Sequence, residues 1–233
     1  MDQNAARKTV EKALGQGRRA LNEYEAKKVL SAYDIPVTRE VLVHSREELE
    51  RALRETGFPL VLKACSADLA HKTEKNLVRV DLRSPDEAAA AFEEIIGQIP
   101  DKDEDSGVLV QEMISGKREL VIGMTRDPQF GPCVMFGLGG IFTEILKDIA
   151  FRKAPIDKDE AFRLMQDIQG RRILEAVRGM PAADTDILAN MLIQVGRIGL
   201  DMDAVAEIDI NPVILAKSSP VAADALIVLS EKQ

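Results

Sequence analysis

The sequence predicts an α+β fold that is built as two lobes. Its strand-like apolar runs and its helical patterns alternate irregularly, unlike the regular strand–helix repeat of a doubly wound sheet. The length of 233 residues is enough for one large domain or for two lobes. The acidic run at residues 101–105 is typical of a solvated loop, and strand-like runs and glycines become more frequent after it. We therefore expect the boundary between the lobes near this run.

The N-terminal region is expected to contain a leader followed by one helix. Residues 1–19 are polar and interrupted by glycines, so we predict a loosely attached polar leader. Asn22 offers a helix N-cap, with Glu25 as its capping-box partner. Apolar residues then follow at helical spacing until Pro36, which cannot continue the helix. The folded domain is expected to span residues 20–233.

The small lobe, at about residues 38–107, is expected to contain two capped helices among its strands. Ser45 and Ser84 begin these helices with acidic residues in the first turn, and Gly57 and Pro100 end them. Strands are expected at residues 41–43, 58–64 and 77–82.

The large lobe, at about residues 108–233 together with the helix at 20–36, is expected to be rich in strands. Strand-like runs occur at residues 108–113, 119–125, 132–136, 142–146, 150–154, 207–215 and 221–229. Two helices fit residues 158–169 and 185–198, where Asp157 and Asp184 supply the N-caps.

The composition limits the partners and the compartment. A net charge of -8 excludes the basic surface of a general nucleic-acid binder, although a few lysines and a divalent ion still permit nucleotide binding. Cys65 and Cys133 lack metal-ligand spacing, so we expect free thiols in a reducing compartment. The sequence shows no signal-peptide pattern, and no apolar run approaches the ~20 residues of a membrane span. We therefore expect a cytoplasmic protein without nucleic-acid or membrane partners.

Two segments of the small lobe contain residues with chemical potential. Lys63 lies near the end of an apolar strand, where it either extends its head group to water or clamps a phosphate. His71 lies in the polar loop 65–76 beside Lys72 and Thr73, and a neutral imidazole nitrogen can carry a phosphoryl group. A lone loop histidine is more often structural, as we expect for His44.

Two segments of the large lobe suit a nucleotide. The strand at 108–113 can offer its backbone to adenine, and Glu112 or Glu119 can accept a hydrogen bond from ribose. Gly139 and Gly140 follow an apolar strand, where they either form an ordinary tight turn or let a ligand approach the backbone. Neither the Rossmann nor the P-loop spacing is present.

A third segment suits a metal ion. Strand alternation places Glu207, Asp209 and Asn211 on one face, with isoleucines on the other. Asp224 lies on the strand expected next and can meet Asn211 across a hairpin. Mg²⁺ prefers such oxygen ligands and keeps several waters. The alternative is a polar outer face on an edge strand.

Taken in order, these motifs resemble the ATP-grasp beta subunit of NDP-forming acyl-CoA synthetases, as in ADP-forming acetate–CoA ligase and, more distantly, succinyl-CoA synthetase. The similarity covers about residues 21–229. The motifs that carry it are LNEYEAK at 21–27, YDIPV at 33–37, FPLVLK at 58–63, DPQFGP at 127–132, FGLGGIF at 136–142 and DINP at 209–212.

The resemblance implies an ATP-grasp fold whose two α+β lobes clasp ATP or ADP, and it implies roles for the site residues. Mg²⁺ would be ligated by Asn211 and Asp224, with Asp209 close by. His71 matches a phosphohistidine that passes phosphate between a histidine of a partner subunit and the nucleotide. The nucleotide would be contacted by Lys63, Gln111, Glu112, Met113, Glu119, Gly139 and Gly140.

The implied reaction converts acyl-CoA, ADP and phosphate into acid, CoA and ATP. We expect a separate CoA-binding alpha subunit, joined with this chain in a heterotetramer, to bind CoA and a small carboxylic acid. Residues 75–77 (KNL) depart from the family, which has a hydrophobic residue and two glycines after Glu74. Two alternatives therefore remain: an ATP-grasp carboxylate–amine ligase working through an acyl phosphate, and a non-catalytic nucleotide-sensing subunit.

Overall fold

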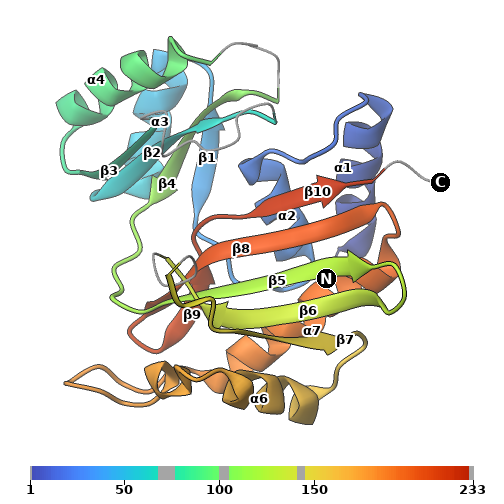
Figure 1. Cartoon of the computed structure of the whole chain (residues 1–233). Coiled ribbons are helices and arrows are strands. Elements are labelled where there is room, and N and C mark those ends of the chain that lie inside the picture. Colours follow the sequence, from blue (N-terminus) through green and yellow to red (C-terminus); the bar gives the residue numbers. More distant parts are fainter. Residues whose placement is uncertain (1, 68–76, 100–104, 141–144, 231–233) are drawn as a thin grey trace. The chain divides into compact units, whose positions relative to one another are not determined.

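The computed structural model of the protein describes residues 2–67, 77–99, 105–140 and 145–230 (Figure 1). The chain divides into two compact units. The larger unit comprises Met1–Leu21, Glu25–Val37 and Ile114–Gln233, and the smaller unit comprises Asn22–Tyr24 and Thr38–Met113. Each unit has one antiparallel sheet with helices packed on it, so the predicted α+β class is confirmed.

The smaller unit is built on a four-stranded sheet with the strand order β1-β4-β2-β3. Its elements are β1 (Glu40–Val43), α3 (Arg46–Thr56), β2 (Leu60–Cys65), β3 (Val78–Leu82), α4 (Pro85–Ile96) and β4 (Gly107–Glu112). Leu60 and Leu62 of β2 pack in one apolar core with residues of both helices. Because side chains alternate along a strand, Val61 and Lys63 point to the opposite face of the sheet.

Both helices of the smaller unit begin where the sequence predicts. The N–H of Glu48 donates to Ser45 Oγ at 3.3 Å, and the N–H of Glu87 donates to Ser84 Oγ at 3.2 Å. α3 ends at Gly57, whose φ of 76° lies in the left-handed region that favours glycine. Local capping signals therefore define these two helices.

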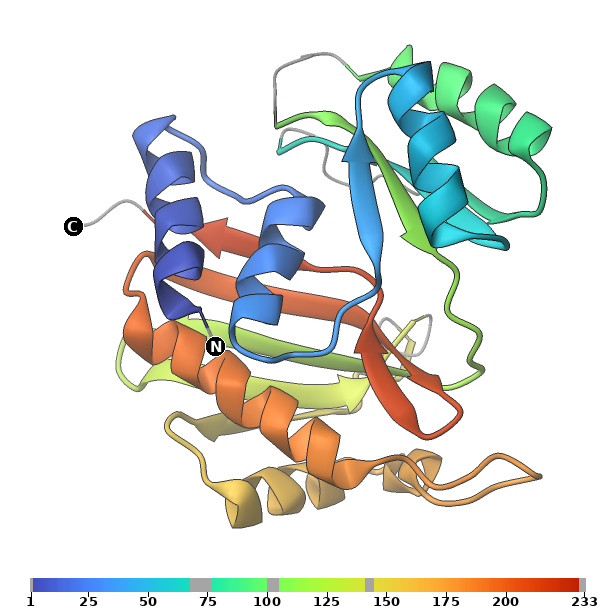
Figure 2. The same cartoon turned by 180° about the vertical axis from the view of Figure 1, so that it is seen from behind.

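The larger unit is built on a six-stranded sheet with the order β10-β8-β5-β6-β7, and β9 pairs with β8. The strands are β5 (Glu119–Asp127), β6 (Gly131–Leu138), β7 (Ile149–Lys153), β8 (Val205–Ala216), β9 (Ser219–Ala222) and β10 (Leu226–Leu229). The helices are α1 (Gln3–Gly15), α2 (Glu23–Ala32, whose first two residues belong to the smaller unit), α6 (Lys158–Asp167), the 3₁₀ helix η1 (Arg171–Leu174) and α7 (Thr185–Asp201). Helices α1, α2 and α7 cover one face of this sheet (Figure 2), and Figure 1 looks onto the other face. Within the described residues, no helix is long and apolar enough to cross a membrane.

Three details of the larger unit differ from expectation. Residues 3–15 form α1, and its Ala6, Val10 and Ala13 are buried in the core, so this segment is not a loosely attached leader. The strand expected at 221–229 is divided, because residues 223–225 leave the ladder to form a connection between β9 and β10. Residues 145–146 are helical, and the rest of the strand expected at 142–146 lies outside the described residues.

Candidate functional site

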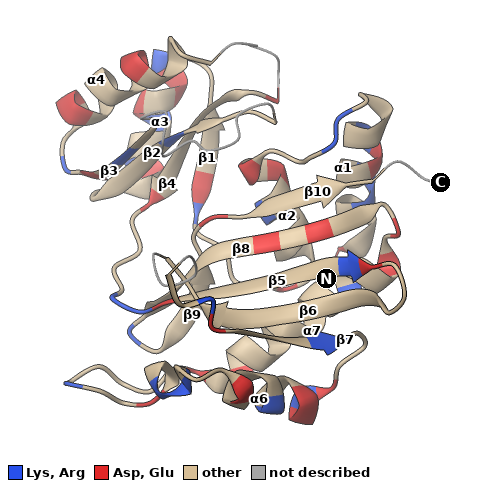
Figure 3. Cartoon of the chain, in the orientation of Figure 1, with Lys and Arg blue, Asp and Glu red and all other residues tan. Residues whose placement is uncertain are grey.

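Strand β8 carries the segment that the sequence assigns to a metal. Ile208 and Ile210 are buried in the core of the larger unit. Glu207, Asp209 and Asn211 therefore face the opposite, open side of the sheet, as predicted. The acidic positions of β8 are visible there in Figure 3. These three residues line a shallow hollow together with apolar side chains of β5, β6 and β7.

Asp209 lies in surroundings that disfavour its charged form. Burial raises the pKa of its carboxyl to about 6, and the negative charges of Glu207 and Asp224 add to this increase. Asp224 lies in the connection between β9 and β10, not on a strand as predicted. The N–H of Ala223 donates to the carbonyl oxygen of Pro212 at 3.0 Å, which holds this connection beside β8. A bound cation would relieve the repulsion among these carboxylates.

The oxygen donors on this face fit Mg²⁺. Asn211 offers an amide oxygen, and Asp209 and Asp224 offer carboxylates. No group of three or more His, Cys, Asp or Glu side chains gathers into a metal site within the described residues. Mg²⁺ is commonly held by only one or two carboxylates and keeps several waters, so this small donor set suits it.

The glycines after β6 are packed tightly against β5 and β8. The N–H of Gly139 donates to the carbonyl oxygen of Glu119 at 2.9 Å, and the N–H of Gly140 donates to Asn211 Oδ1 at 3.2 Å. A β-carbon at Gly139 would lie 2.5 Å from the carbonyl oxygen of Leu120, and one at Gly140 would lie 2.1 Å from Glu119 Oε2. Only glycine permits this approach, which brings Glu119, both glycines and Asn211 together.

Gly140→Ala should lower the free energy of unfolding by roughly 2–4 kcal/mol. The φ of Gly140 is +60°, which is costly for alanine, and the new β-carbon also collides with the Glu119 carboxylate. Gly131→Ala is the matched control, because Gly131 has a φ of +75° but nothing within 4 Å of the added carbon. Urea unfolding of both variants measures the difference. Equal losses would show that the Glu119 carboxylate moves aside without a measurable cost.

Lys63 is buried in the smaller unit. Lys63 is only 7% exposed, and its Nζ lies 2.7 Å from Glu23 Oε1. The interpretation that Lys63 extends its head group to water is therefore wrong. Sequence reasoning did not indicate Glu23, the first residue of α2, as the partner of Lys63. The available signal was the lysine itself, because a buried ammonium needs an acidic partner. Periodicity does not indicate which acidic residue that partner is.

Gln111 lies on the same face of the smaller sheet as Lys63. In the register of β2 with β4, Lys63 lies opposite Leu109, and Gln111 lies opposite Val61. Because side chains alternate, residues two positions apart share a face. Two of the residues expected at the nucleotide are therefore diagonal neighbours on this face, with Gln111 only 3% exposed.

Glu112 and Met113 have backbone partners within the smaller unit. The carboxylate of Glu112 accepts hydrogen bonds from Nε and from the backbone N–H of Arg39, both at 2.8 Å. The N–H of Glu112 donates to the carbonyl oxygen of Arg39 at 3.0 Å, and that of Met113 donates to the carbonyl oxygen of Pro59 at 3.3 Å. The backbone N–H groups of these two residues are therefore already paired, so an adenine contact here would use other atoms of Glu112 and Met113.

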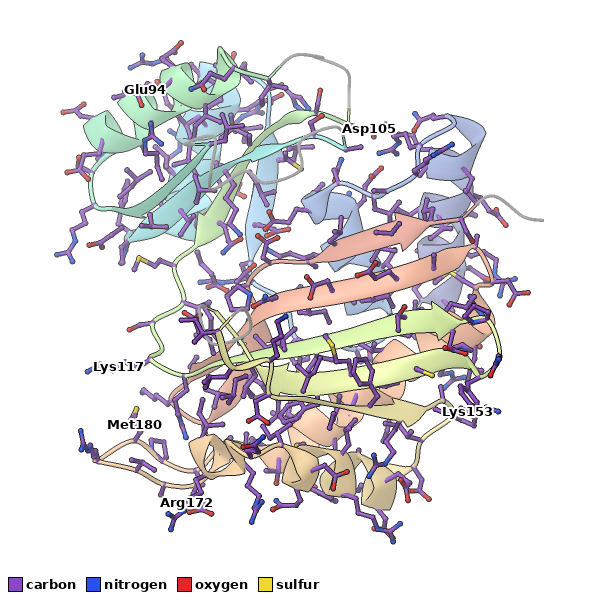
Figure 4. All side chains as sticks on the ribbon, in the orientation of Figure 1. Glu94, Asp105, Lys117, Lys153, Arg172 and Met180 are labelled. Carbon is purple, nitrogen blue, oxygen red and sulfur yellow. The ribbon has the colours of Figure 1, made fainter. Side chains whose placement is uncertain are left out.

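Two buried charged residues of the larger unit were not indicated by sequence reasoning either. The carboxylate of Asp148 accepts the N–H groups of Gln169 at 2.8 Å and Gly170 at 2.6 Å. The guanidinium of Arg118 binds the segment at residues 173–181. Figure 4 labels Arg172 and Met180, which mark the position of this segment. The guanidinium donates to four main-chain carbonyls, those of Ile173, Glu175, Pro181 and Lys217.

The remaining catalytic prediction, His71, lies outside the described residues. Lys63, Gln111, Glu112 and Met113 belong to the smaller unit, whereas the glycines, Glu119 and the metal-ligand candidates belong to the larger unit. Each unit thus contains one cluster of the predicted site residues.

Comparison with known proteins assigns the chain to one family. The family model described as "ATP-grasp domain" matches residues 12–229. Subunit beta of acetate–CoA ligase [ADP-forming] I from Pyrococcus furiosus is 40% identical over 227 residues, covering 96% of this chain and 97% of the relative. The acetate–CoA ligase [ADP-forming] I of Archaeoglobus fulgidus is 38% identical, and the match covers 34% of its length.

Solved structures give the same result. A Ca. Korarchaeum cryptofilum acetyl-coenzyme A synthetase, in complex with coenzyme A and Ca-AMPCP, matches with a TM-score of 0.91 and 42% identity, covering 97% of this chain and 100% of that chain. A second structure of that enzyme holds coenzyme A and Mg-AMPPCP, with its phosphohistidine segment pointing towards the nucleotide binding site. It matches with a TM-score of 0.86 and 41% identity.

Proposed function

Because this chain belongs to the ATP-grasp family and matches beta subunits of ADP-forming acetate–CoA ligases over nearly their whole length, we propose that it is the nucleotide-binding subunit of an ADP-forming acyl-CoA synthetase. The reaction interconverts acyl-CoA, ADP and phosphate with a carboxylic acid, CoA and ATP. The observation that carries the proposal is the convergence of Glu119, Gly139, Gly140 and Asn211 near the half-buried Asp209.

In this proposal, the residues of the larger unit hold the nucleotide and its metal. Asn211 and Asp224, with Asp209 close by, bind Mg²⁺, which neutralises charge on the phosphates when bound. Gly139 and Gly140 let the nucleotide approach the backbone, and Glu119 accepts a hydrogen bond from its ribose or adenine.

The residues of the smaller unit supply a cation and the catalytic nucleophile. The Lys63 ammonium contacts the nucleotide phosphates, and Gln111, Glu112 and Met113 line the adenine. A ring nitrogen of His71 accepts a phosphoryl group from a phosphohistidine of the partner subunit. A terminal phosphate oxygen of ADP then attacks that phosphorus, so the bond to His71 breaks as ATP forms.

We further propose that a separate alpha subunit binds CoA and the acid and forms a heterotetramer with this chain. The support is that two relatives, each matched over at least 97% of its length, are named beta subunits. We place the complex in the cytoplasm, because Cys65 and Cys133 do not form a disulfide and a reducing compartment keeps thiols in that state.

The test uses the chain with and without its alpha subunit. We expect the chain alone to bind Mg-ATP, as measured by calorimetry, without forming acyl-CoA. Adding the alpha subunit should give turnover that depends on CoA, ATP and one of a panel of carboxylic acids. Robust acyl-CoA formation by this chain alone would overturn the two-subunit proposal, and failure to bind Mg-ATP would overturn the proposed function.

A further inference from the structure

The ion pair between Lys63 and Glu23 is buried on both sides. The Lys63 side chain is 8% exposed and the Glu23 side chain 0% exposed, and 2.7 Å separate Nζ from Oε1. Buried ion pairs stabilise a fold poorly, because desolvation offsets their attraction and apolar replacements are often neutral or stabilising. A contribution to stability therefore does not account for the presence of this pair, and its role must lie in where the two charges are placed.

Both members of the pair are fixed by regular structure. Lys63 lies on β2, an inner strand between β4 and β3. Glu23 is the first residue of α2, where the helix N-terminus favours a negative charge. The preceding Asn22 donates from Nδ2 to the carbonyl oxygen of Asp105 at 2.6 Å, which anchors the start of this helix within the smaller unit.

We propose that Glu23 is a positioning residue that aims the Lys63 ammonium at the nucleotide phosphates. Lysine has a flexible four-carbon chain, and ordering it when the nucleotide binds would cost affinity. A carboxylate fixed at a helix start orders the ammonium beforehand and compensates for its burial. The inference rests on the proposed role of Lys63 as the phosphate contact.

Glu23→Gln should weaken binding of Mg-ATP and Mg-ADP by about tenfold. Binding of adenosine, which has no phosphate, should stay at the wild-type level. Glu23→Asp keeps the negative charge and should recover part of the lost affinity. Calorimetry on the full chain measures ATP and ADP, and competition measures adenosine.

Glu25→Gln is the matched control on the same helix. Glu25 forms a different, largely buried ion pair, in which its Oε1 lies 2.7 Å from Arg18 Nη2. Loss of this ion pair should lower stability without changing the ratio of ATP affinity to adenosine affinity. Thermal melts confirm that each variant is folded. If Glu23→Gln does not fold, two other variants replace it. These are Glu23→Asp and the double variant Glu23→Gln with Lys63→Met, because neither leaves a buried unpaired charge.

The outcomes separate this inference from the proposed function. A loss of affinity for the phosphate-bearing nucleotides in Glu23→Gln that is absent in Glu25→Gln supports positioning. Positioning is also supported if Lys63→Met binds ATP equally well with and without Glu23→Gln. Equal losses for ATP and adenosine would show a purely structural role and overturn it. Wild-type ATP affinity in Lys63→Met would overturn the phosphate role of Lys63 itself. A weakened Lys63→Met beside an unaffected Glu23→Gln would overturn only the inference on Glu23.

Discussion

His71→Asn should reduce turnover of the complex with the alpha subunit by roughly 10⁴-fold or more. Asparagine is of similar size and remains polar, but it has no ring nitrogen to carry a phosphoryl group. Because the lysine and metal-ligand residues are unchanged, Mg-ATP binding should stay at the wild-type level. Formation of ATP from acyl-CoA, ADP and phosphate measures turnover, and calorimetry measures binding.

His44→Asn provides the control for this experiment. Its Nδ1 lies 3.3 Å from Glu48 Oε2, and both side chains are exposed, so the pair contributes little to stability. His44→Asn should therefore retain full turnover. Wild-type turnover in His71→Asn would reject the phosphate shuttle. The alternative function, a carboxylate–amine ligase, needs no phosphohistidine. Trapping of radiolabelled phosphate on His71 would exclude that alternative directly.

Asp209→Asn should stabilise the metal-free protein above pH 6. The pKa of Asp209 is raised from 3.8 to about 6 in the folded state, so between these values the folded state binds more protons than the unfolded state. Stability is therefore greatest below the unfolded pKa and decreases as the pH rises through the folded pKa. The asparagine variant avoids this loss, which corresponds to up to about 3 kcal/mol at pH 7.5.

Urea unfolding in EDTA at pH 4 and pH 7.5 measures this effect. The two proteins should differ little at pH 4 and most at pH 7.5, and Mg²⁺ should stabilise the wild type more than the variant. Asp203→Asn is the control, because the Asp203 side chain is 88% exposed and its replacement should change stability by less than ~0.5 kcal/mol. A destabilised Asp209→Asn at pH 7.5 in EDTA would contradict the account of this carboxylate.

Local signals made much of the fold predictable. The helices that begin after Ser45, Ser84, Asp157 and Asp184 have the predicted caps, because a capping side chain binds a backbone N–H only a few residues away. The attachment of α1 was not predictable in this way. Its three buried residues recur at helical spacing, but the core that covers them is formed by distant segments.

The site shows the same division between local and distant information. Strand alternation alone placed Glu207, Asp209 and Asn211 on one face. The approach of Gly140 to Asn211 joins residues 71 positions apart, and that of Lys63 to Glu23 joins residues 40 positions apart. No spacing rule reaches over such distances. Family resemblance supplied the assignment of Asn211 and Lys63 to one site, and it did not indicate Glu23.

The Arg118 guanidinium described above has a consequence for local stability. Its four carbonyl partners lie in segments that otherwise have few strand or helix hydrogen bonds. Arg118 itself is only 5% exposed. Opening of residues 173–181 would leave these carbonyls and a cation to be solvated together, so the segment should open as one cooperative unit. Amide hydrogen exchange in this segment would therefore report on the hydrogen bonds that Arg118 donates to it.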